Sequence, residues 1–141
     1  MKKRLLYVLL PIVTLILESM PYGAVCNFAN PEGGPFRKTF SYFDLTPFGY
    51  ANFAPLITAV ITCIVFLLIV IFCITGNPKW ACTARNILCV CTVFSLGPLV
   101  LGIRFFSIVG ALITMSLIAE LLVIQFTLKN RQHKCEFVGE I

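Results

Sequence analysis

Hydrophobic residues in this chain fall into four long runs, and they neither alternate nor recur only at every third and fourth position. A helix needs roughly 20 apolar residues to cross the hydrocarbon core of a bilayer. The pattern predicts an all-α membrane protein, a bundle of four transmembrane helices that forms a single integral membrane domain over residues 1–141. The expected helices cover about residues 5–24, 53–75, 82–101 and 105–128.

The composition agrees with this interpretation. Hydrophobic residues make up 59% of the chain and charged residues only 12%, whereas about a quarter of the residues of a soluble domain are charged. Such a chain is outside the class of ordinary soluble globular proteins.

The basic residues predict how the helices are oriented. Eight of the eleven lysines and arginines lie at or beyond the same ends of the predicted helices, and only Arg37, Lys38 and Arg104 lie on the other side. The positive-inside rule places the larger group in the cytoplasm. We therefore expect a multi-pass plasma-membrane protein with both termini cytoplasmic and a cytoplasmic tail over 129–141. The net charge of +5 then reflects contact with anionic lipid and not nucleic-acid binding. The eight are Lys2, Lys3, Arg4, Lys79, Arg85, Lys129, Arg131 and Lys134.

A cleaved signal peptide is the alternative for the first run, because MKKR followed by an apolar stretch resembles one. However, Glu18 interrupts the stretch and no A-x-A site follows it. We expect the first helix to be retained.

Residues 21–52 form the larger predicted external segment. The turn sequence NPEGGP, at 30–35, separates two stretches rich in strand-forming residues. This predicts a small extracytoplasmic β-hairpin, with strands at 24–28 and 37–43, that acts as a lid on the bundle. Asn52 is the expected N-cap of the second helix.

Six aromatic residues lie between Thr39 and Phe53, with one charged residue among them. One interpretation is packing of the lid and of the membrane interface, where aromatic rings concentrate. We assign Phe40 and Phe43 to such packing. The other interpretation is a recognition surface, for which the candidates are Tyr42, Phe48 and Tyr50.

Glu18 lies within the first predicted helix, and a charged group at membrane depth is costly. Tyr7 and Thr14 share its helix face, because spacings of three, four and seven return to one side. Arg104, in the predicted outer turn, is the candidate partner in an ion pair. The alternative is a ligand or coupling-ion site.

Glu120 lies in the fourth predicted helix, on one face with Ser116. A protonated Glu120 could donate to the Tyr7 hydroxyl or to a carbonyl freed by Pro11. Interhelical hydrogen bonding and proton or cation handling both remain open for it. Glu18 and Glu120 are expected at different depths, so they do not form a catalytic pair. Thr58 and Thr62, on one face of the second helix, predict close packing of helices.

The seven cysteines do not form a redox or metal-binding pattern. No C-x-x-C occurs, the single histidine is His133, and Cys26 is the lone external thiol. Whether Cys26 pairs with another chain is open. Hydrolase, zinc-protease, P-loop and dinucleotide motifs are missing as well. We therefore predict no enzymatic activity, no metal site and no cofactor.

The stretches PYGAVCNFANPEGG and FSYFDLTPFGYANFAP resemble small uncharacterised four-helix bacterial integral membrane proteins. In layout alone the chain is also similar to claudins, which have four spans and a larger first external loop. A claudin loop carries a W…GLW motif and two cysteines, but this loop has no tryptophan and only Cys26, so the resemblance does not imply a tight-junction function. The paired redox cysteines of the four-helix vitamin K epoxide reductases are missing too.

Two functions follow from these observations. The first is an interaction, accessory or assembly subunit that uses its aromatic external loop, with the lipid bilayer and a protein partner or a second copy of the chain as partners. The alternative is a small transporter or sensor that uses the intramembrane carboxyl groups of Glu18 and Glu120.

Overall fold

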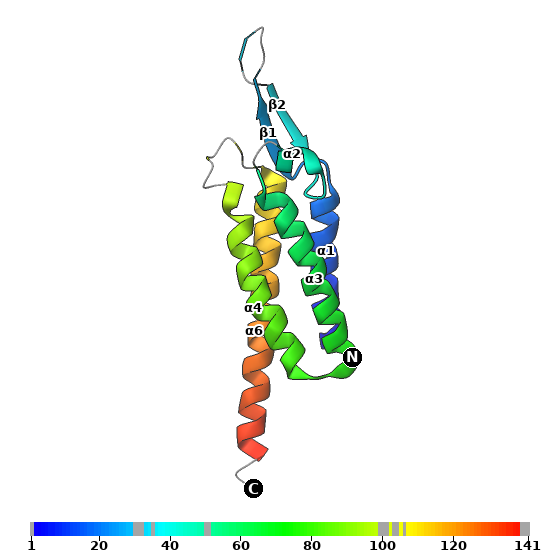
Figure 1. Ribbon diagram of the computed structural model, residues 1–141. Helices are drawn as coiled ribbons and strands as arrows, with labels where there is room; N and C mark the ends of the chain where they lie inside the picture. Colours follow the sequence, from blue (N-terminus) through cyan, green and yellow to red (C-terminus); the bar gives the residue numbers. More distant parts are fainter. Residues whose placement is uncertain are drawn as a thin grey trace.

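The computed structural model describes residues 2–29, 33–34, 36–49, 52–98, 102, 105 and 107–138, and describes side chains from Tyr7 to Lys129. The protein is mostly helical, with a small two-stranded antiparallel sheet (Figure 1). The elements in chain order are α1 (Lys2–Ser19), β1 (Ala24–Phe28), β2 (Phe36–Phe40), α2 (Leu45–Gly49), α3 (Ala54–Thr75), α4 (Pro78–Ser95) and α6 (Ile108–Val138).

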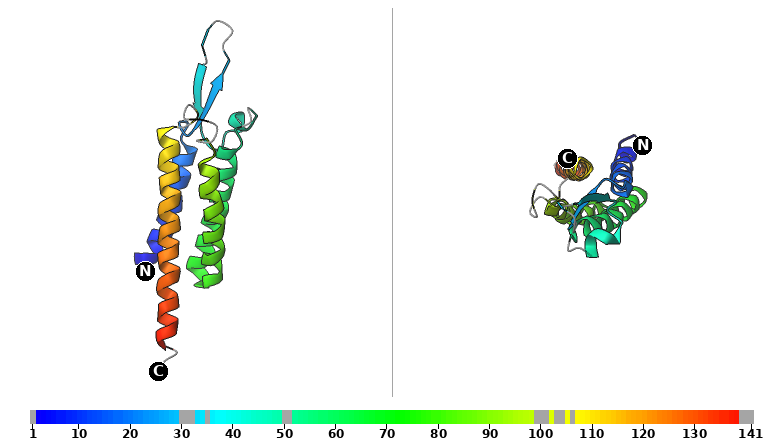
Figure 2. Two further views of the ribbon diagram at one scale, coloured as in Figure 1. Left: turned by 90° about the vertical axis from the view of Figure 1, so that its left-hand side faces the viewer. Right: turned by 90° about the horizontal axis from the view of Figure 1, so that it is seen from above.

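In the described part of the chain, the long helices α1, α3, α4 and α6 run up and down beside one another (Figures 1 and 2). α1 contacts α3 and α6, and α4 contacts the same two helices, so the four enclose a common core. The hairpin and α2 lie at one end, here called the hairpin end. α1 begins, and α3 passes into α4, at the opposite end, here called the basic end (Figure 1).

By length and composition, two helices and not the predicted four are candidates for membrane spans. α3 and residues Ile108–Lys129 of α6 are long and apolar enough to cross a membrane. The apolar part of α1 is shorter, covering Tyr7–Ser19, and the first half of α4 contains Lys79, Arg85 and Asn86.

The helix limits differ from the predicted ones except for α3. Its end is marked by Gly76, whose φ of 68° lets its N–H donate to the carbonyl of Phe72 at 2.9 Å. The predicted N-cap at Asn52 is wrong, because Phe53 occupies that position. The Asn52 side chain is buried and donates to the carbonyl of Val25 at 3.5 Å.

α4 begins at Pro78 and ends at Ser95, earlier at both ends than the predicted 82–101. Asn77 caps it by accepting a hydrogen bond from the N–H of Lys79 at 3.0 Å, and Pro78 lacks an N–H that would need a partner. Residues 96–107 connect α4 to α6 in place of the predicted short turn. α6 begins at Ile108 and continues to Val138, so much of the predicted tail at 129–141 is helical.

The predicted hairpin is present, with Ala24 opposite Phe40 and Phe28 opposite Phe36. The first strand matches the prediction, while the second covers 36–40 and not 37–43. It ends early because the N–H of Tyr42 donates to the Glu18 carbonyl at 2.9 Å, which draws the chain away from β1. The strands of the hairpin point away from the helix ends (Figures 1 and 2), and of the predicted lid only the base, with Ala24 and Tyr42 in the core cluster, covers the helices.

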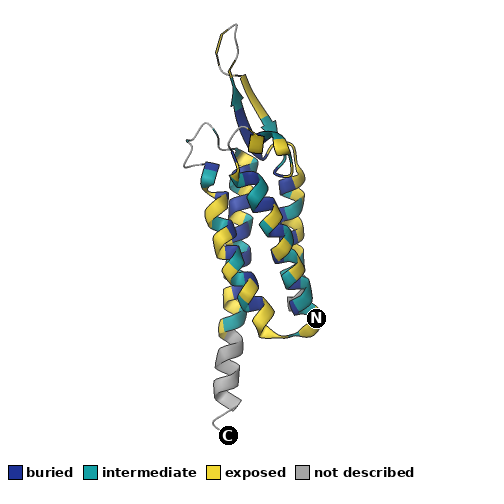
Figure 3. Ribbon diagram, viewed as in Figure 1, coloured by how far each residue is buried: buried dark blue, intermediate teal, exposed yellow. Residues whose placement is uncertain are grey.

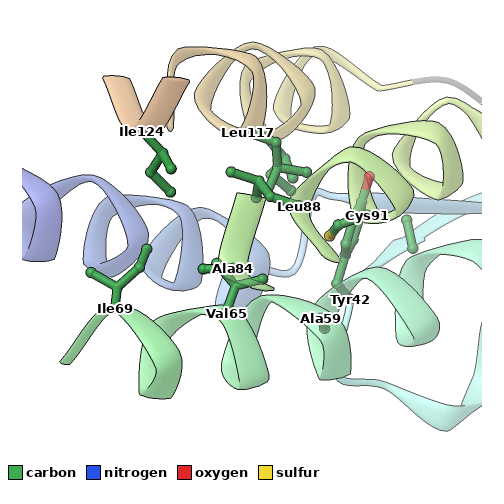
Figure 4. Packing of buried hydrophobic residues seen from close by; sticks show 11 residues of the cluster. Tyr42, Ala59, Val65, Ile69, Ala84, Leu88, Cys91, Leu117 and Ile124 are labelled. Carbon is green, nitrogen blue, oxygen red and sulfur yellow. The ribbon is translucent and has the colours of Figure 1, made fainter. Parts of the chain in front are cut away.

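The core lies between the long helices, and the buried residues recur along each of them (Figure 3). Val65 and Ile69 of α3, Leu88 of α4 and Leu117 of α6 form its centre (Figure 4). Tyr42 closes the core at the hairpin end, and only 1% of its surface is exposed.

The Tyr42 ring lies directly against the backbone of Gly23. A Cβ atom at Gly23 would lie 2.8 Å from Cδ1 of Tyr42 and 2.9 Å from Cε1. A Cβ atom at Gly110 would lie 3.3 Å from the Tyr42 hydroxyl oxygen. The ring therefore fits because residue 23 has no side chain.

We expect Gly23→Ala to destabilise the protein by about 1–3 kcal/mol, since the added methyl group overlaps a fully packed ring. Gly49→Ala is the matched control, because a Cβ atom there meets nothing within 4 Å. Thermal unfolding in detergent measures both changes. Equal stability of the two variants would contradict this packing.

Candidate functional site

Polar side chains lie in the interior between the long helices. Seven of them are buried on these helices, and each of the four helices contributes at least one. Buried polar groups need hydrogen-bond partners, and these groups find them mainly across helix interfaces. They are Thr14, Glu18, Thr58, Thr62, Ser95, Thr114 and Glu120.

Glu18 joins α1 to α3. Its side chain is fully buried, and its Oε1 lies 2.8 Å from the hydroxyl of Thr62. The same hydroxyl lies 2.9 Å from the carbonyl of Thr58 and 3.6 Å from the sulfur of Cys91 on α4. The carboxyl group therefore belongs to a contact among three helices.

Glu120 joins α6 to α1. Its side chain is 1% exposed, and its Oε1 accepts a short hydrogen bond from the hydroxyl of Thr14. Thr14 also lies 2.6 Å from the hydroxyl of Ser116 and 3.2 Å from the carbonyl of Leu10. This contact repeats the arrangement at Glu18: a carboxyl oxygen faces a threonine hydroxyl that also lies near a helix carbonyl.

The two carboxyl groups lie about one helical turn apart along α1. Thr14 and Glu18 differ by four residues and so share a face of α1, with a rise of about 6 Å between them. Among the described residues, the Oε2 atoms of Glu18 and Glu120 have no hydrogen-bond partner. No lysine or arginine side chain contacts either group in that part of the chain.

Two further hydroxyl pairs continue the polar contacts toward both ends. Ser95 of α4 lies 2.6 Å from Thr114 of α6. Toward the basic end, Thr127 of α6 lies 2.7 Å from the hydroxyl of Tyr7. A cavity of about 10 Å³ adjoins Tyr7 and Thr127, and such a volume holds about one water molecule.

The structure brings together part of the predicted polar site. Thr14, Ser116 and Glu120 meet as one cluster, and Glu18 lies on the same face of α1. Tyr7 pairs with Thr127, so the expected contact from Glu120 to Tyr7 is wrong. Arg104, the predicted ion-pair partner of Glu18, lies outside the described residues.

Sequence reasoning assigned no polar role to Thr62, Thr58 or Cys91. The signal was present, because Thr58 and Thr62 are four residues apart and share a helix face. It was interpreted as a close-packing surface only. Nothing in the sequence indicated that Glu18 faces this surface.

The aromatic candidates divide between the core and the surface. The prediction that Tyr42 belongs to an exposed recognition surface is wrong, because its ring is buried. Phe48 is 41% exposed and packs edge-on against the exposed ring of Phe53, with 4.8 Å between centroids. We call these two residues the α2 aromatic pair. Tyr50 lies outside the described residues.

The aromatic residues assigned to packing are also divided. Phe40 is half-buried and packs against the core and against Phe28. Phe43 is exposed, contrary to its predicted role as part of a roof.

The remaining titratable groups at the hairpin end have local roles. The carboxyl group of Asp44 accepts a hydrogen bond from the backbone N–H of Thr46 at 2.8 Å, which lowers the pKa of Asp44 and caps α2. Cys26 is buried, and burial raises the pKa of its thiol. In the described residues no group of three or more histidine, cysteine or acidic side chains is arranged to hold a metal ion.

Scans of protein-family models, curated proteins and solved structures find no match to this chain. The site must therefore be interpreted from its own geometry.

We expect Thr62→Val to destabilise the protein by about 1–3 kcal/mol, because it removes the hydroxyl that Glu18 contacts inside the core. Thr75→Val is the control on the same helix, since the Thr75 side chain is exposed and its hydroxyl bonds only the nearby backbone, of Ile71 and Asn77. Thr62→Ser keeps the hydroxyl and should retain most of the stability. Chemical unfolding measures all three, and a Thr62→Val protein as stable as Thr75→Val would contradict the assigned contact.

Proposed function

We propose that this chain is a multi-pass plasma-membrane protein whose four long helices cross the bilayer. We further propose that it acts as an interaction or accessory subunit through its hairpin end. The proposal includes no catalytic activity and no cofactor.

The observation that carries the membrane assignment is the distribution of polar and apolar side chains. The helices expose large apolar residues along their outer faces, while hydroxyl and carboxyl groups lie between the helices. A soluble protein rarely exposes such extensive apolar surface. The exposed residues are Leu9, Ile12, Val13 and Ile16 on α1, Val60, Ile64, Leu67 and Ile74 on α3, Val90, Val93 and Phe94 on α4, and Leu112, Met115, Ile118, Leu122 and Phe126 on α6.

The helix lengths are compatible with four spans. α1 and α4 contain 18 residues each, which corresponds to about 27 Å, close to the roughly 30 Å thickness of the hydrocarbon core. Lys79 and the half-exposed Trp80 lie in the first turn of α4, where a lysine can extend to the headgroups and a tryptophan can anchor the interface.

The orientation follows from the charges at the two ends. Lys79 and Arg85 lie at the basic end, where α1 starts with Lys2, Lys3 and Arg4. The described basic residues of the hairpin end are Arg37 and Lys38. Under the positive-inside rule the basic end faces the cytoplasm, and the hairpin lies outside.

The hairpin end has two features that favour a protein partner. The α2 aromatic pair and Leu45 are all exposed within residues 45–53, and exposed aromatic residues are frequent anchors of interfaces. A two-stranded hairpin is marginally stable on its own in water, yet β1 and β2 project beyond the helices (Figure 2). A protein that covers the hairpin edge and the aromatic pair would stabilise both.

The first test concerns topology. A cysteine introduced for Lys38, on β2, should react with a membrane-impermeant thiol reagent in intact cells. A cysteine introduced for Lys79, in the first turn of α4, should react only after permeabilisation. Both side chains are exposed, and the labelling of the unmodified protein supplies the background. Labelling of position 79 but not of position 38 in intact cells would reverse the orientation, and labelling of both in intact cells would argue against spanning.

The second test concerns the partner. Phe48→Ala should reduce co-purification of a specific protein at least tenfold, as a hot-spot aromatic does. It should lower thermal stability only moderately, because the ring is 41% exposed and its aromatic neighbour, Phe53, is itself exposed. Phe126→Ala is the matched control, since Phe126 is an exposed phenylalanine on the lipid-facing side of α6. If both variants retain every co-purifying protein, the hairpin end is not the interaction surface.

A further inference from the structure

The buried carboxyl groups of Glu18 and Glu120 lack a balancing charge in the described part of the chain. Two ionised groups would repel each other inside an apolar core, and each would retain an Oε2 atom without a partner. An uncompensated buried charge is strongly unfavourable. A proton on each carboxyl group removes that charge without a basic side chain.

The contacts at Glu18 provide a place for this proton. The Thr62 hydroxyl lies within hydrogen-bond distance of Oε1 of Glu18 and of the carbonyl of Thr58, and the thiol of Cys91 lies 3.7 Å from the same carbonyl. If Oε1 carries a proton, the acid donates to Thr62, and Thr62 donates to Thr58, so the contact is kept without a buried charge.

The same reasoning applies at Glu120. The Thr14 hydroxyl lies near Oε1 of Glu120 and near the carbonyl of Leu10, and it also meets the hydroxyl of Ser116. With Glu120 protonated, Thr14 accepts from Glu120 and Ser116 and donates to Leu10. The hydroxyl groups and the Oε1 atoms of both contacts then have partners of the correct kind, and each unpaired Oε2 is the oxygen of a neutral acid and not of a carboxylate.

We propose that Glu18 and Glu120 form a two-carboxyl proton-binding site, which holds two protons while α1, α3 and α6 are packed together and releases them when these helices separate. On release the O–H bond of each acid breaks, the proton passes to water, and the electron pair remains on the carboxylate. The chemical ligand is the proton. The site makes the packing of α1 sensitive to pH.

The groups that surround the pair support this chemistry. From α3, Glu18 meets Thr62, with Cys63 and Thr58 nearby on that helix; from α4 it meets Cys91, and from the loop after β2 it meets the backbone of Tyr42. Glu120 meets Thr14 of α1, and its own helix supplies Ser116. The titratable groups among them are thiols, a phenol and the two acids, and none carries a positive charge at neutral pH.

The proposal does not depend on the aromatic pair or on a protein partner. It concerns the interior of the helices, whereas the proposed interaction function concerns the hairpin end. Loss of the partner in Phe48→Ala leaves the proton site intact, and loss of the proton site leaves labelling of the hairpin end unchanged. The two proposals can therefore fail separately.

The direct test is infrared spectroscopy of the purified full-length chain in lipid at neutral pH. The C=O stretch of a protonated carboxylic acid should be present, and isotopic labelling of glutamate should shift it. Glu18→Gln and Glu120→Gln should each remove about half of the band, and the double variant should remove all of it. Asp44→Asn is the control, because Asp44 is a surface carboxylate, and it should leave the band unchanged.

The second measurement is thermal stability as a function of pH. An unfolded glutamate releases its proton above about pH 4.3, while the packed helices retain theirs. Since the folded state then binds more protons, stability should fall as the pH rises above that value. The Glu18→Gln, Glu120→Gln double variant should show no such fall, because glutamine keeps the shape and a donor but does not titrate.

Three results would overturn the proposal. The first is that the wild-type protein shows no protonated glutamate band at neutral pH. The second is a double variant that loses the same stability as wild type when the pH rises. The third is that sodium or lithium ions, at constant pH, raise the wild-type melting temperature but not that of the double variant, which would identify a metal cation as the ligand.

Discussion

The contact of buried carboxyl groups with threonine hydroxyls is the constraint on which the helix arrangement depends. Each of the four helix interfaces contains at least one polar contact. Glu18 meets Thr62 between α1 and α3, Thr14 meets Glu120 between α1 and α6, Thr62 meets Cys91 between α3 and α4, and Ser95 meets Thr114 between α4 and α6. In the bilayer that we propose for this chain, apolar side chains would pack against lipid as readily as against one another. The polar contacts therefore fix the axial register that apolar packing leaves free.

The backbone of Glu18 also determines how the hairpin joins the helices. The carbonyl of Glu18 accepts the N–H of Tyr42, which ends β2 and directs the ring over Gly23. Ser107, just before α6, donates to the Gly23 carbonyl at 2.6 Å. The end of α1, the base of the hairpin and the start of α6 are consequently held at one point.

The sequence was sufficient for the features with local causes. Gly76 ends α3, the turn between 28 and 36 separates two strands, and the long apolar runs form helices. It was insufficient where distant contacts override local preference. Tyr42 continues a strand-like alternation but is drawn into the core by Glu18, and Asn52 resembles an N-cap but donates to Val25. The polar site was predicted only in part for the same reason. The spacing of residues in the sequence shows that Thr14 and Glu18 share one face of α1, but the contact between Glu18 and Thr62 is a tertiary contact that spacing does not show.

Positions 18 and 120 are both occupied by glutamic acid and not by glutamine, which has nearly the same shape. A glutamine at position 18 or 120 could supply a donor and an acceptor of similar reach to the same hydroxyls. It would fix the register equally well at every pH. A glutamic acid does so only while protonated, and once ionised it places a charge in an apolar interior. If register were the sole requirement, the acid would be the less suitable residue at both sites. The property that distinguishes the acids from glutamine is reversible proton binding, and this favours a role for the interior in responding to pH over one of static support.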